Sequence, residues 1–338
     1  MKTIGFIKSL KIEEADSLFE VDQPMPELKQ QDVLVRIEAI SINPADAKIR
    51  IRSAAEQPHD EPKILGYDAV GVIEKLGPDV AGFKEGDRVW YAGDVNRPGS
   101  YAEYQAVDHR IIAKAPVGVA PTSSASMPLV SLTAWEILFD RLQVPLDDSS
   151  SSLLIIGGAG GVGSVTTQLA RALTQLQVVA TASRPESSDW CRKMGAHEVV
   201  DHRDLVQNFR ATDREFAEFI VQYADLAQHW DAMCELVAPQ GRIGTIVETS
   251  EKIDISALQG KSAALMWELM FTRTLFGTAD IANQGHILDR VARLVEDGTI
   301  QTTQTRVLTG LSAETLKTAH EIIESGTMIG KLVVDFTK

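Results

Sequence analysis

Short apolar runs, several of them alternating with polar residues, fill the first hundred positions of the chain. They occupy residues 4–7, 33–42, 69–76 and 87–91. Turn signals separate them, among them Gly77-Pro78 and the segment 84–87. Because strands this close in sequence pair most simply with their neighbours, the pattern predicts a compact, largely antiparallel barrel.

The pattern changes near Pro121. A helical stretch is predicted from Pro128 to Leu142, and strand-like segments then alternate with helical ones. The predicted strands lie at 153–156, 178–182, 198–200, 216–221 and 242–247. Helices are predicted from Gly161 and over 229–237. Such alternation indicates a parallel sheet with helices on both faces.

After Thr274 the sequence predicts a helix over 287–296, an extended segment, a second helix over 313–325 and a last strand over 330–336. This segment is too long to be a tail. We expect it to return to the N-terminal domain.

A glycine-rich turn joins the strand that ends near Ile156 to the helix that follows. It reads Gly158-Ala159-Gly160-Gly161-Val162-Gly163 and fits the dinucleotide-binding pattern G-x-G-x-x-G. The first glycine permits the turn, the second admits a pyrophosphate, and the third lets the helix pack closely. Phosphates would then meet the N–H groups at the helix N-terminus. A glycine turn without a ligand is the alternative.

The next strand ends in Ser183 and Arg184. An NAD site usually has an acidic residue here, about 20 residues after the glycines, to bind the ribose 2′-hydroxyl. Ser183 can instead donate a hydrogen bond to a 2′-phosphate, and Arg184 can supply positive charge. The sequence therefore favours NADP(H), unless Arg184 is a solvated loop residue.

Composition narrows the class of protein. The 338 residues are enough for two domains, and the net charge of −14 argues against general binding to nucleic acids or anionic membranes. No signal-peptide pattern or apolar run of about 18 residues occurs, so we expect a cytoplasmic protein. The only cysteines, Cys191 and Cys234, make neither a disulfide framework nor a cysteine-rich zinc site.

The order of motifs along the chain resembles the medium-chain dehydrogenase/reductases, and most closely their quinone oxidoreductase branch, the zinc-type alcohol dehydrogenase-like proteins. Apart from the glycine turn, the matching segments are 41–46, 66–71, 86–89, 99–104, 128–135, 193–196, 239–242 and 329–333. They cover nearly the whole chain in order.

This resemblance implies a mixed α/β fold: a GroES-like catalytic domain from residues 1–124 and 281–338, and a Rossmann NADP(H)-binding domain from residues 125–280. The active site would lie in the cleft between them. Family members commonly pair through the edge strands of their Rossmann sheets. The resemblance places that strand near residues 270–276 and implies a homodimer or homotetramer.

Departures from the family pattern concern the metal. Zinc alcohol dehydrogenases have a cysteine ligand where this chain has Asn43, and Gly-His-Glu where it has Gly66-Tyr67-Asp68. The region of their structural-zinc lobe has no cysteine here. Since zinc prefers thiolate, imidazole and carboxylate ligands, we expect no catalytic and no structural zinc.

Hydride transfer from NADPH to a quinone or an activated alkene needs no metal, because the cofactor carries the chemistry. As catalytic residues we expect Asn43, which could hydrogen-bond the acceptor oxygen, and Tyr67, which could also donate a proton. Asn43 also fits a turn before Pro44, and Tyr67 also fits a packed barrel residue. Asp46 and Asp68 are expected to be structural hydrogen-bonding groups.

The resemblance adds three cofactor contacts: Thr133 near the nicotinamide, His202 near the adenosine, and Lys331. A helix hydroxyl bonded to its own backbone, a surface histidine and a solvated lysine are the respective alternatives. Four aromatic residues are candidates to stack on a flat acceptor, or else ordinary packing residues. They are Trp90, Tyr91, Trp135 and Trp267.

The leading hypothesis is thus an NADPH-dependent reductase of a quinone, enone or aldehyde that works without zinc. An alcohol dehydrogenase with an atypical metal site is a second hypothesis. A non-catalytic NADPH-binding protein is a third, since no strong acid/base constellation is evident. The sequence does not name the acceptor, because fold alone does not fix it.

Overall fold

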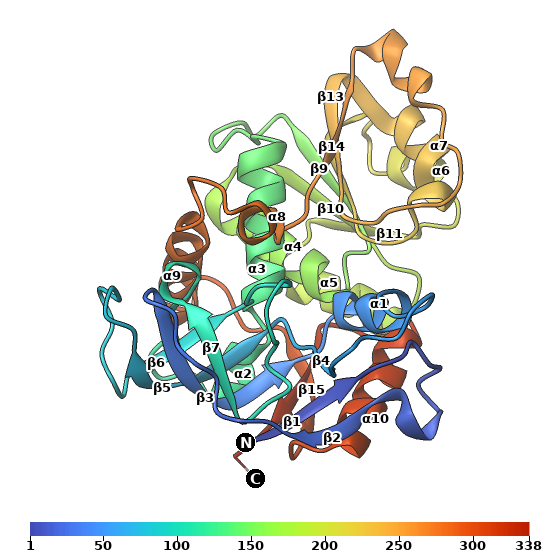
Figure 1. Ribbon diagram of the computed structural model, residues 1–338. Coiled ribbons are helices and arrows are strands. Elements are labelled where there is room, and N and C mark those ends of the chain that lie inside the picture. The colour runs from blue at the N-terminus through green and yellow to red at the C-terminus, as the bar shows by residue number, and fades with distance from the viewer. Residues whose placement is uncertain (338) are drawn as a thin grey trace. The chain divides into compact units, whose positions relative to one another are not determined.

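The computed structural model describes residues 1–337 and has the mixed α/β fold expected from the sequence (Figure 1). Residue contacts divide the chain into two units. The first joins residues 1–129 to the segment that begins at Phe271, and the second spans residues 130–270. The sequence placed these boundaries at 124/125 and 280/281.

The first unit is built on a seven-stranded sheet around β3 (Asp32–Ser41). The sheet order is β15-β16-β3-β5-β6-β8, and β7 also pairs with β3. Its other strands are β5 (Ala69–Leu76), β6 (Arg88–Tyr91), β7 (Tyr104–Asp108), β8 (Ala113–Lys114), β15 (Gln304–Thr309) and β16 (Lys331–Asp335). A second sheet has the order β2-β1-β4, from β1 (Lys2–Phe6), β2 (Phe19–Asp22) and β4 (Lys63–Ile64). All pairs but β15–β16 are antiparallel, as the alternating pattern predicted.

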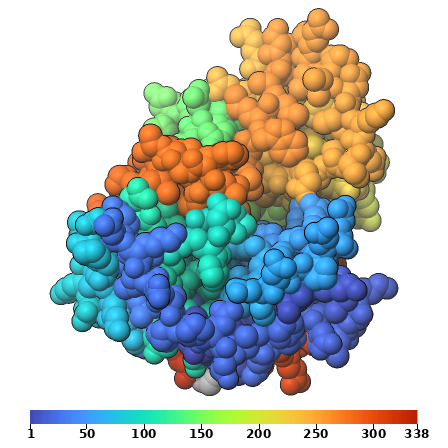
Figure 2. Space-filling view, in the orientation of Figure 1, coloured from blue at the N-terminus to red at the C-terminus, as the bar shows by residue number. Residues whose placement is uncertain are grey.

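The C-terminal segment returns to this unit, because β16 pairs antiparallel with β3. Its first long helix, α9, packs on β6 and β8. In the space-filling view, residues coloured blue to cyan form one continuous surface (Figure 2). The helices of the unit are α1 (Pro44–Arg52), α2 (Pro121–Ala125), α8 (Thr272–Phe276), α9 (Asn283–Glu296) and α10 (Ala313–Glu324). Helix α3 (Pro128–Trp135) begins in this unit and continues into the second.

The second unit is a six-stranded parallel sheet with the order β11-β10-β9-β12-β13-β14. Its strands are β9 (Ser152–Ile156), β10 (Gln177–Thr181), β11 (Glu198–Val200), β12 (Ala217–Gln222), β13 (Val237–Thr245) and β14 (Ala264–Trp267). This is the doubly wound order, in which the connections change direction between the first and fourth strands. Here these are β9 and β12, so the glycine turn lies at the position where such sheets bind ligands.

Apolar faces hold the second unit together. In α4 (Gly161–Leu173), Val165 and Leu169 lie one helical turn apart and are fully buried. Strand β9 is buried along its whole length, which explains its unbroken apolar run. The remaining helices are α5 (Pro185–Lys193), α6 (Leu205–Arg210) and α7 (Leu226–Leu236).

One predicted strand is wrong. Residues 272–276 form the short helix α8, which Gly277 ends in the left-handed conformation with φ +55°. The edge strand of the parallel sheet is instead β14, a few residues earlier. The family resemblance placed a strand here, but the Gly277 stop and the Arg273–Asp280 ion pair favour a helical turn.

The pattern did not predict the helices α1 and α5. Each begins with a proline, α1 with Pro44 and α5 with Pro185. Both are rich in charged or polar residues and lack a clear apolar stripe. The helix predicted over 128–142 is present, but its second half, residues 136–141, winds as a wider π-helix. None of the helices described is long and apolar enough to cross a bilayer.

A buried histidine links α10 to the first unit's core. His320 is fully buried, and its Nε2 lies 3.0 Å from the Tyr101 hydroxyl. The Arg50 guanidinium of α1 is also buried. It donates to the carboxylate of Glu324, which lies on α10 together with His320, at 2.5 Å. Burial, and then the charge of Arg50, lower the pKa of His320 to about 3. The imidazole is therefore neutral in the folded protein at neutral pH.

Because the unfolded His320 has an ordinary pKa near 6.5, the unfolded chain binds the extra proton first as pH falls. His320 thus contributes stability at neutral pH that is lost between about pH 6.5 and pH 3. Between pH 7 and pH 5 we expect it to account for about 2 kcal/mol of the loss. Urea unfolding at both pH values should show a smaller pH-dependent loss for His320→Gln than for the wild type. The exposed His286→Gln variant should match the wild type; equal losses in all three proteins would contradict the prediction.

Candidate active site and cofactor site

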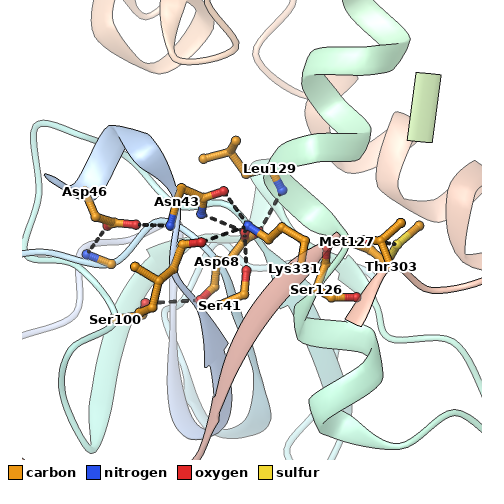
Figure 3. Close-up of polar contacts among 12 residues, drawn as sticks. Ser41, Asn43, Asp46, Asp68, Ser100, Ser126, Met127, Leu129, Thr303 and Lys331 are labelled. Atoms are coloured by element: carbon orange, nitrogen blue, oxygen red, sulfur yellow. Dashed lines mark hydrogen bonds and ion pairs between the residues drawn. The ribbon is translucent and has the colours of Figure 1, made fainter. Parts of the chain in front are cut away.

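A buried carboxylate, Asp68, organises the candidate catalytic residues of the first unit (Figure 3). It lies just before β5 and is 1% exposed. Its Oδ2 accepts hydrogen bonds from Ser41 Oγ at 2.7 Å and from Asn43 Nδ2 at 2.8 Å. Its Oδ1 accepts from the Leu129 N–H at 2.7 Å. Asp68 therefore joins the end of β3 and the start of α3 to its own strand.

Lys331, the first residue of β16, completes this group. Its ammonium donates to Asp68 Oδ2 at 3.1 Å, to Asn43 Oδ1 at 2.5 Å and to the Ile42 carbonyl at 3.3 Å. The side chain is 4% exposed, so the alternative of a solvated lysine is wrong. An ammonium has three N–H groups, and three oxygens lie within hydrogen-bonding distance here.

Asp46 fixes the start of α1 next to this group. Its Oδ2 accepts from the Asn43 N–H at 2.7 Å and its Oδ1 from the Gly66 N–H at 3.1 Å. Burial raises the pKa of Asp46 to about 7, against the effect of these bonds and of the Lys331 charge. The structural role predicted for Asp46 and Asp68 is confirmed.

Burial also raises the pKa of Asp68, while Lys331, Asn43, the Leu129 N–H and Ser41 act in the opposite direction. All four of these partners donate to the carboxylate. Their arrangement matches the ionised form, because a carboxylate only accepts hydrogen bonds.

Asn43 is held on both ends of its amide. It is 1% exposed and is the N-cap residue of α1, a helix that the sequence did not predict. Its Oδ1 accepts from Lys331 and its Nδ2 donates to Asp68. One N–H of Nδ2 remains for a further acceptor, and the catalytic role of Asn43 stays a prediction.

The Tyr67 hydroxyl, in contrast to the Asn43 amide, makes no hydrogen bond with residues 1–337. Its ring is fully buried and meets Phe271 edge-on, with centroids 5.1 Å apart. Its Oη finds no hydrogen-bond partner among residues 1–337. Burial, and then the Asp46 charge, raise the pKa of Tyr67 above its ordinary value. The phenol therefore keeps its proton and can act as a donor.

These residues do not suit a zinc ion. Among residues 1–337 no three His, Cys, Asp or Glu side chains lie close enough together to hold a metal. The one carboxylate at a ligand position, Asp68, already binds an ammonium and three neutral donors. An amide and a protonated phenol are poor zinc ligands.

The second unit carries the predicted phosphate turn, and α4 begins at Gly161 as expected. A Cβ on Gly163 would lie 2.3 Å from the Gly157 carbonyl oxygen and 2.7 Å from Gly158 Cα. A Cβ on Gly160 would have only the Gly157 oxygen within 4 Å, at 3.6 Å. Gly163 is thus required by close packing within the protein, whereas Gly160 leaves open space where a pyrophosphate would approach.

Hydrogen bonds brace this turn from both sides. The Gly157 N–H donates to Thr181 Oγ1 at 3.0 Å, which ties the turn to the end of β10. Trp190 of α5 donates from Nε1 to Ser164 Oγ at 2.8 Å, and Ser164 donates to the Gly160 carbonyl at 2.7 Å. The sequence did not predict either brace, because an indole and a hydroxyl carry no signal of a partner so far along the chain.

Ser183 and Arg184 lie between β10 and α5, and Arg184 is the N-cap residue of α5. The Arg184 side chain is exposed, and its Nε lies 3.6 Å from Glu186 Oε1. Glu186 thus places a negative charge beside the guanidinium that the residues at the strand end alone did not indicate. An incoming 2′-phosphate would compete with Glu186 for the guanidinium.

His202 and Thr133, the other two cofactor contacts predicted for this unit, lie in a loop and in a helix. His202 follows β11, and its ring meets His229 of α7 edge-on, with centroids 5.5 Å apart. Its Nδ1 is buried without a partner among residues 1–337. Thr133 is 4% exposed within α3. The cofactor contacts assigned to both residues stay predictions.

The aromatic candidates have different surroundings. Trp90 and Tyr91 are buried in the first unit's sheet, and Trp135 packs on Phe139 with centroids 4.8 Å apart. Trp267 is 51% exposed on β14. Packing explains the first three.

Comparisons with known proteins define the class. Residues 29–117 match the alcohol dehydrogenase GroES-like domain, and residues 194–334 match the zinc-binding dehydrogenase family. The chain is 41% identical, over 99% of its length and all of the relative's, to a zinc-type alcohol dehydrogenase-like protein of Staphylococcus aureus. It therefore belongs to the zinc-type alcohol dehydrogenase-like proteins, oxidoreductases of the medium-chain dehydrogenase/reductase superfamily.

Solved structures agree with this assignment. A candidate zinc-dependent alcohol dehydrogenase from Rhizobium etli has a TM-score of 0.95 and 41% identity, with 99% of this chain and 98% of that one covered. An Escherichia coli quinone oxidoreductase complexed with NADPH has a TM-score of 0.83 at 22% identity, over 99% and 100% of the two chains, and shows the shared fold. Over 54% of this chain and 48% of the relative, a 2-methylene-furan-3-one reductase of tomato is 34% identical.

The two glycines allow a matched test of the phosphate turn. Gly160→Ala should fold with an unchanged melting temperature but bind NADPH at least tenfold more weakly, since its methyl group fills the open space. Gly163→Ala should lower the melting temperature itself, because its Cβ collides with backbone atoms. Thermal unfolding with and without NADPH measures both effects. Unchanged NADPH binding by Gly160→Ala would contradict the prediction.

Proposed function

We propose that this protein is an NADPH-dependent reductase that transfers hydride to a quinone or an activated alkene or carbonyl without zinc. The observation that carries the proposal is the state of the two residues at the ligand positions of zinc dehydrogenases. Asp68 is neutralised by Lys331, while the neighbouring Tyr67 hydroxyl has no partner among residues 1–337 and keeps its proton. This arrangement can donate a proton but offers no ligand set for a Lewis-acidic metal.

Bound NADPH would supply the hydride, which adds to the electrophilic carbon of the acceptor. The electron pair of the acceptor's double bond then moves to its oxygen as an enolate. Tyr67 would donate a hydrogen bond, or its proton, to that oxygen, and the remaining N–H of Asn43 would donate a second. Hydrogen bonds aimed at developing charge stabilise the transition state more than the ground state.

Similarity to the tomato 2-methylene-furan-3-one reductase supports an activated alkene as the acceptor, since that name describes an α,β-unsaturated ketone. NADP(H) is favoured over NAD(H) by Ser183 and Arg184 at the end of β10, where no acidic residue stands.

A homodimer is also part of the proposal. Strand β14 is the edge of the parallel sheet, and Trp267 and Leu269 beside it are 51% and 52% exposed. An edge strand with exposed apolar side chains favours pairing with another chain. Light scattering that gives the mass of a single chain would contradict this part. A cytoplasmic location remains a prediction from the sequence.

Replacing Tyr67 by Phe should lower kcat for enone reduction about a hundredfold with little change in KM, as expected for loss of a general acid. The measurement is NADPH oxidation with quinones and enones, with EDTA present throughout. Tyr104→Phe, on β7 of the first unit, is the matched control. Loss of wild-type activity in EDTA would refute the zinc-free mechanism, and tight NADPH binding without turnover of any acceptor would favour a non-catalytic role.

Removing the guanidinium in Arg184→Ala should raise the Kd for NADPH roughly ten- to hundredfold, because charge-assisted hydrogen bonds contribute about 1.5–3 kcal/mol. The Kd for NADH should hardly change. Arg192→Ala, which removes an exposed charge from the same helix, serves as the control. Equal weakening of NADPH and NADH binding would show that Arg184 does not select the 2′-phosphate.

A further inference from the structure

The corner where β10 ends and α5 begins holds an acidic side chain beside the residues expected to bind a 2′-phosphate. Glu186 is the second residue of α5, and its Oε1 lies 3.6 Å from Arg184 Nε. The Glu186 side chain is 60% exposed and that of Arg184 is 43% exposed. A ligand group that binds the Arg184 guanidinium from solvent therefore meets the Glu186 carboxylate as well.

Packing fixes this corner relative to the glycine turn. Trp190, one turn further along α5, donates to Ser164 Oγ, and Ser164 in turn donates to the Gly160 carbonyl. Cys191 of the same helix lies against the turn, since a Cβ on Gly158 would be 3.2 Å from its Sγ. A dinucleotide whose pyrophosphate lies on such a turn places its adenosine ribose at the end of the next strand. Here that strand is β10, so the ribose would lie beside the first residues of α5.

Three side chains at this corner can form hydrogen bonds with the ribose: Ser183, Arg184 and Glu186. The hydroxyl of Ser187 is not available, because it is buried and bonded to the Arg184 N–H and carbonyl. Ser183 and Arg184 can donate, whereas the Glu186 carboxylate can only accept. A 2′-hydroxyl both donates and accepts, so it suits all three side chains. A 2′-phosphate dianion only accepts, so it suits the two donors alone.

We propose that Glu186 is a specificity-determining residue that lets this site bind NADH as well as NADPH. When NADH binds, the carboxylate accepts a hydrogen bond from the 2′-hydroxyl and keeps its ion pair with Arg184. When NADPH binds, the 2′-phosphate replaces Glu186 at the guanidinium, and the carboxylate turns into solvent. The inference rests on the proposed function and limits the preference for NADPH that Ser183 and Arg184 alone would give.

The exposure of the ion pair sets the size of this effect. Exposed ion pairs change an equilibrium constant by at most about fivefold. Charge-assisted hydrogen bonds from Arg184 to a phosphate contribute roughly ten- to hundredfold. NADPH therefore remains the preferred nucleotide, but by a narrower margin than the arginine alone would produce.

Glu186→Gln tests the proposal, because it keeps the length of the side chain and removes its charge. We expect the Kd for NADPH to fall about three- to fivefold and the Kd for NADH to rise about threefold, both measured by isothermal titration calorimetry. The matched control is Asp189→Asn, which removes an exposed carboxylate of α5 that pairs with Arg192. It should leave both Kd values within about twofold of the wild type. Equal shifts in the two variants would assign the effect to the overall charge of the helix and overturn the proposal.

A double-mutant cycle with Arg184→Ala isolates the competition for the guanidinium. In that background Glu186→Gln should change the Kd for NADPH by less than about twofold, because no guanidinium remains to compete for. The same gain as in the wild-type background would overturn the proposal. An acidic residue in the first turn of α5 also stabilises the helix, but that structural role affects the melting temperature and not the ratio of the two Kd values.

The binding data distinguish failure of this inference from failure of the proposed function. If neither nucleotide binds the wild type, the proposed function is wrong and this inference falls with it. If NADPH binds but Glu186→Gln leaves both Kd values unchanged, this inference alone is overturned. Calorimetry needs no turnover, so both outcomes can be read before any acceptor is found.

Discussion

The buried ion pair between Asp68 and Lys331 is the interaction on which the first unit's candidate site depends. Removing two charges from water costs several kcal/mol for each ion, so such a pair persists only when further hydrogen bonds complete it. Ser41, Asn43 and the Leu129 N–H do so for the carboxylate, and Asn43 and the Ile42 carbonyl do so for the ammonium. The pair thereby fixes where β3, β5, β16 and α3 meet, and with them the position of Asn43.

The candidate site of the second unit depends on the backbone conformation of its glycine turn rather than on buried charges. Its glycine turn exists because Gly163 must approach the Gly157 carbonyl, and because Gly160 leaves room outside it. The glycine at position 163 is therefore needed for folding, whereas the glycine at position 160 leaves room for a ligand. Thr181, Ser164 and Trp190 then hold the turn in a fixed shape before any cofactor arrives, which reduces the ordering cost of binding.

Features with a local cause were readable from the sequence. Neighbouring residues predicted the glycine turn, the apolar strand before it and the helix from Gly161. They also predicted most of the other strands. The helix α8 was mistaken for a strand because the family resemblance, and no pattern within residues 270–276, placed the edge strand there. The ion pair of Asp68 and Lys331 could not be predicted, because 263 positions separate its members and neither residue indicates its partner. The family resemblance drew attention to Lys331 but suggested a cofactor contact.

The pairing of β16 with β3 has a consequence for synthesis on the ribosome. The residues of the parallel sheet, 152–267, emerge as one continuous stretch and can fold as soon as they are out. The sheet of the first unit cannot be completed in this way, because β3 must wait for residues 331–335, which are made after the whole parallel sheet. Until then Asp68 lacks its cation and residues 39–41 of β3 lack their partner strand, so the N-terminal segment completes its fold later than the parallel sheet does.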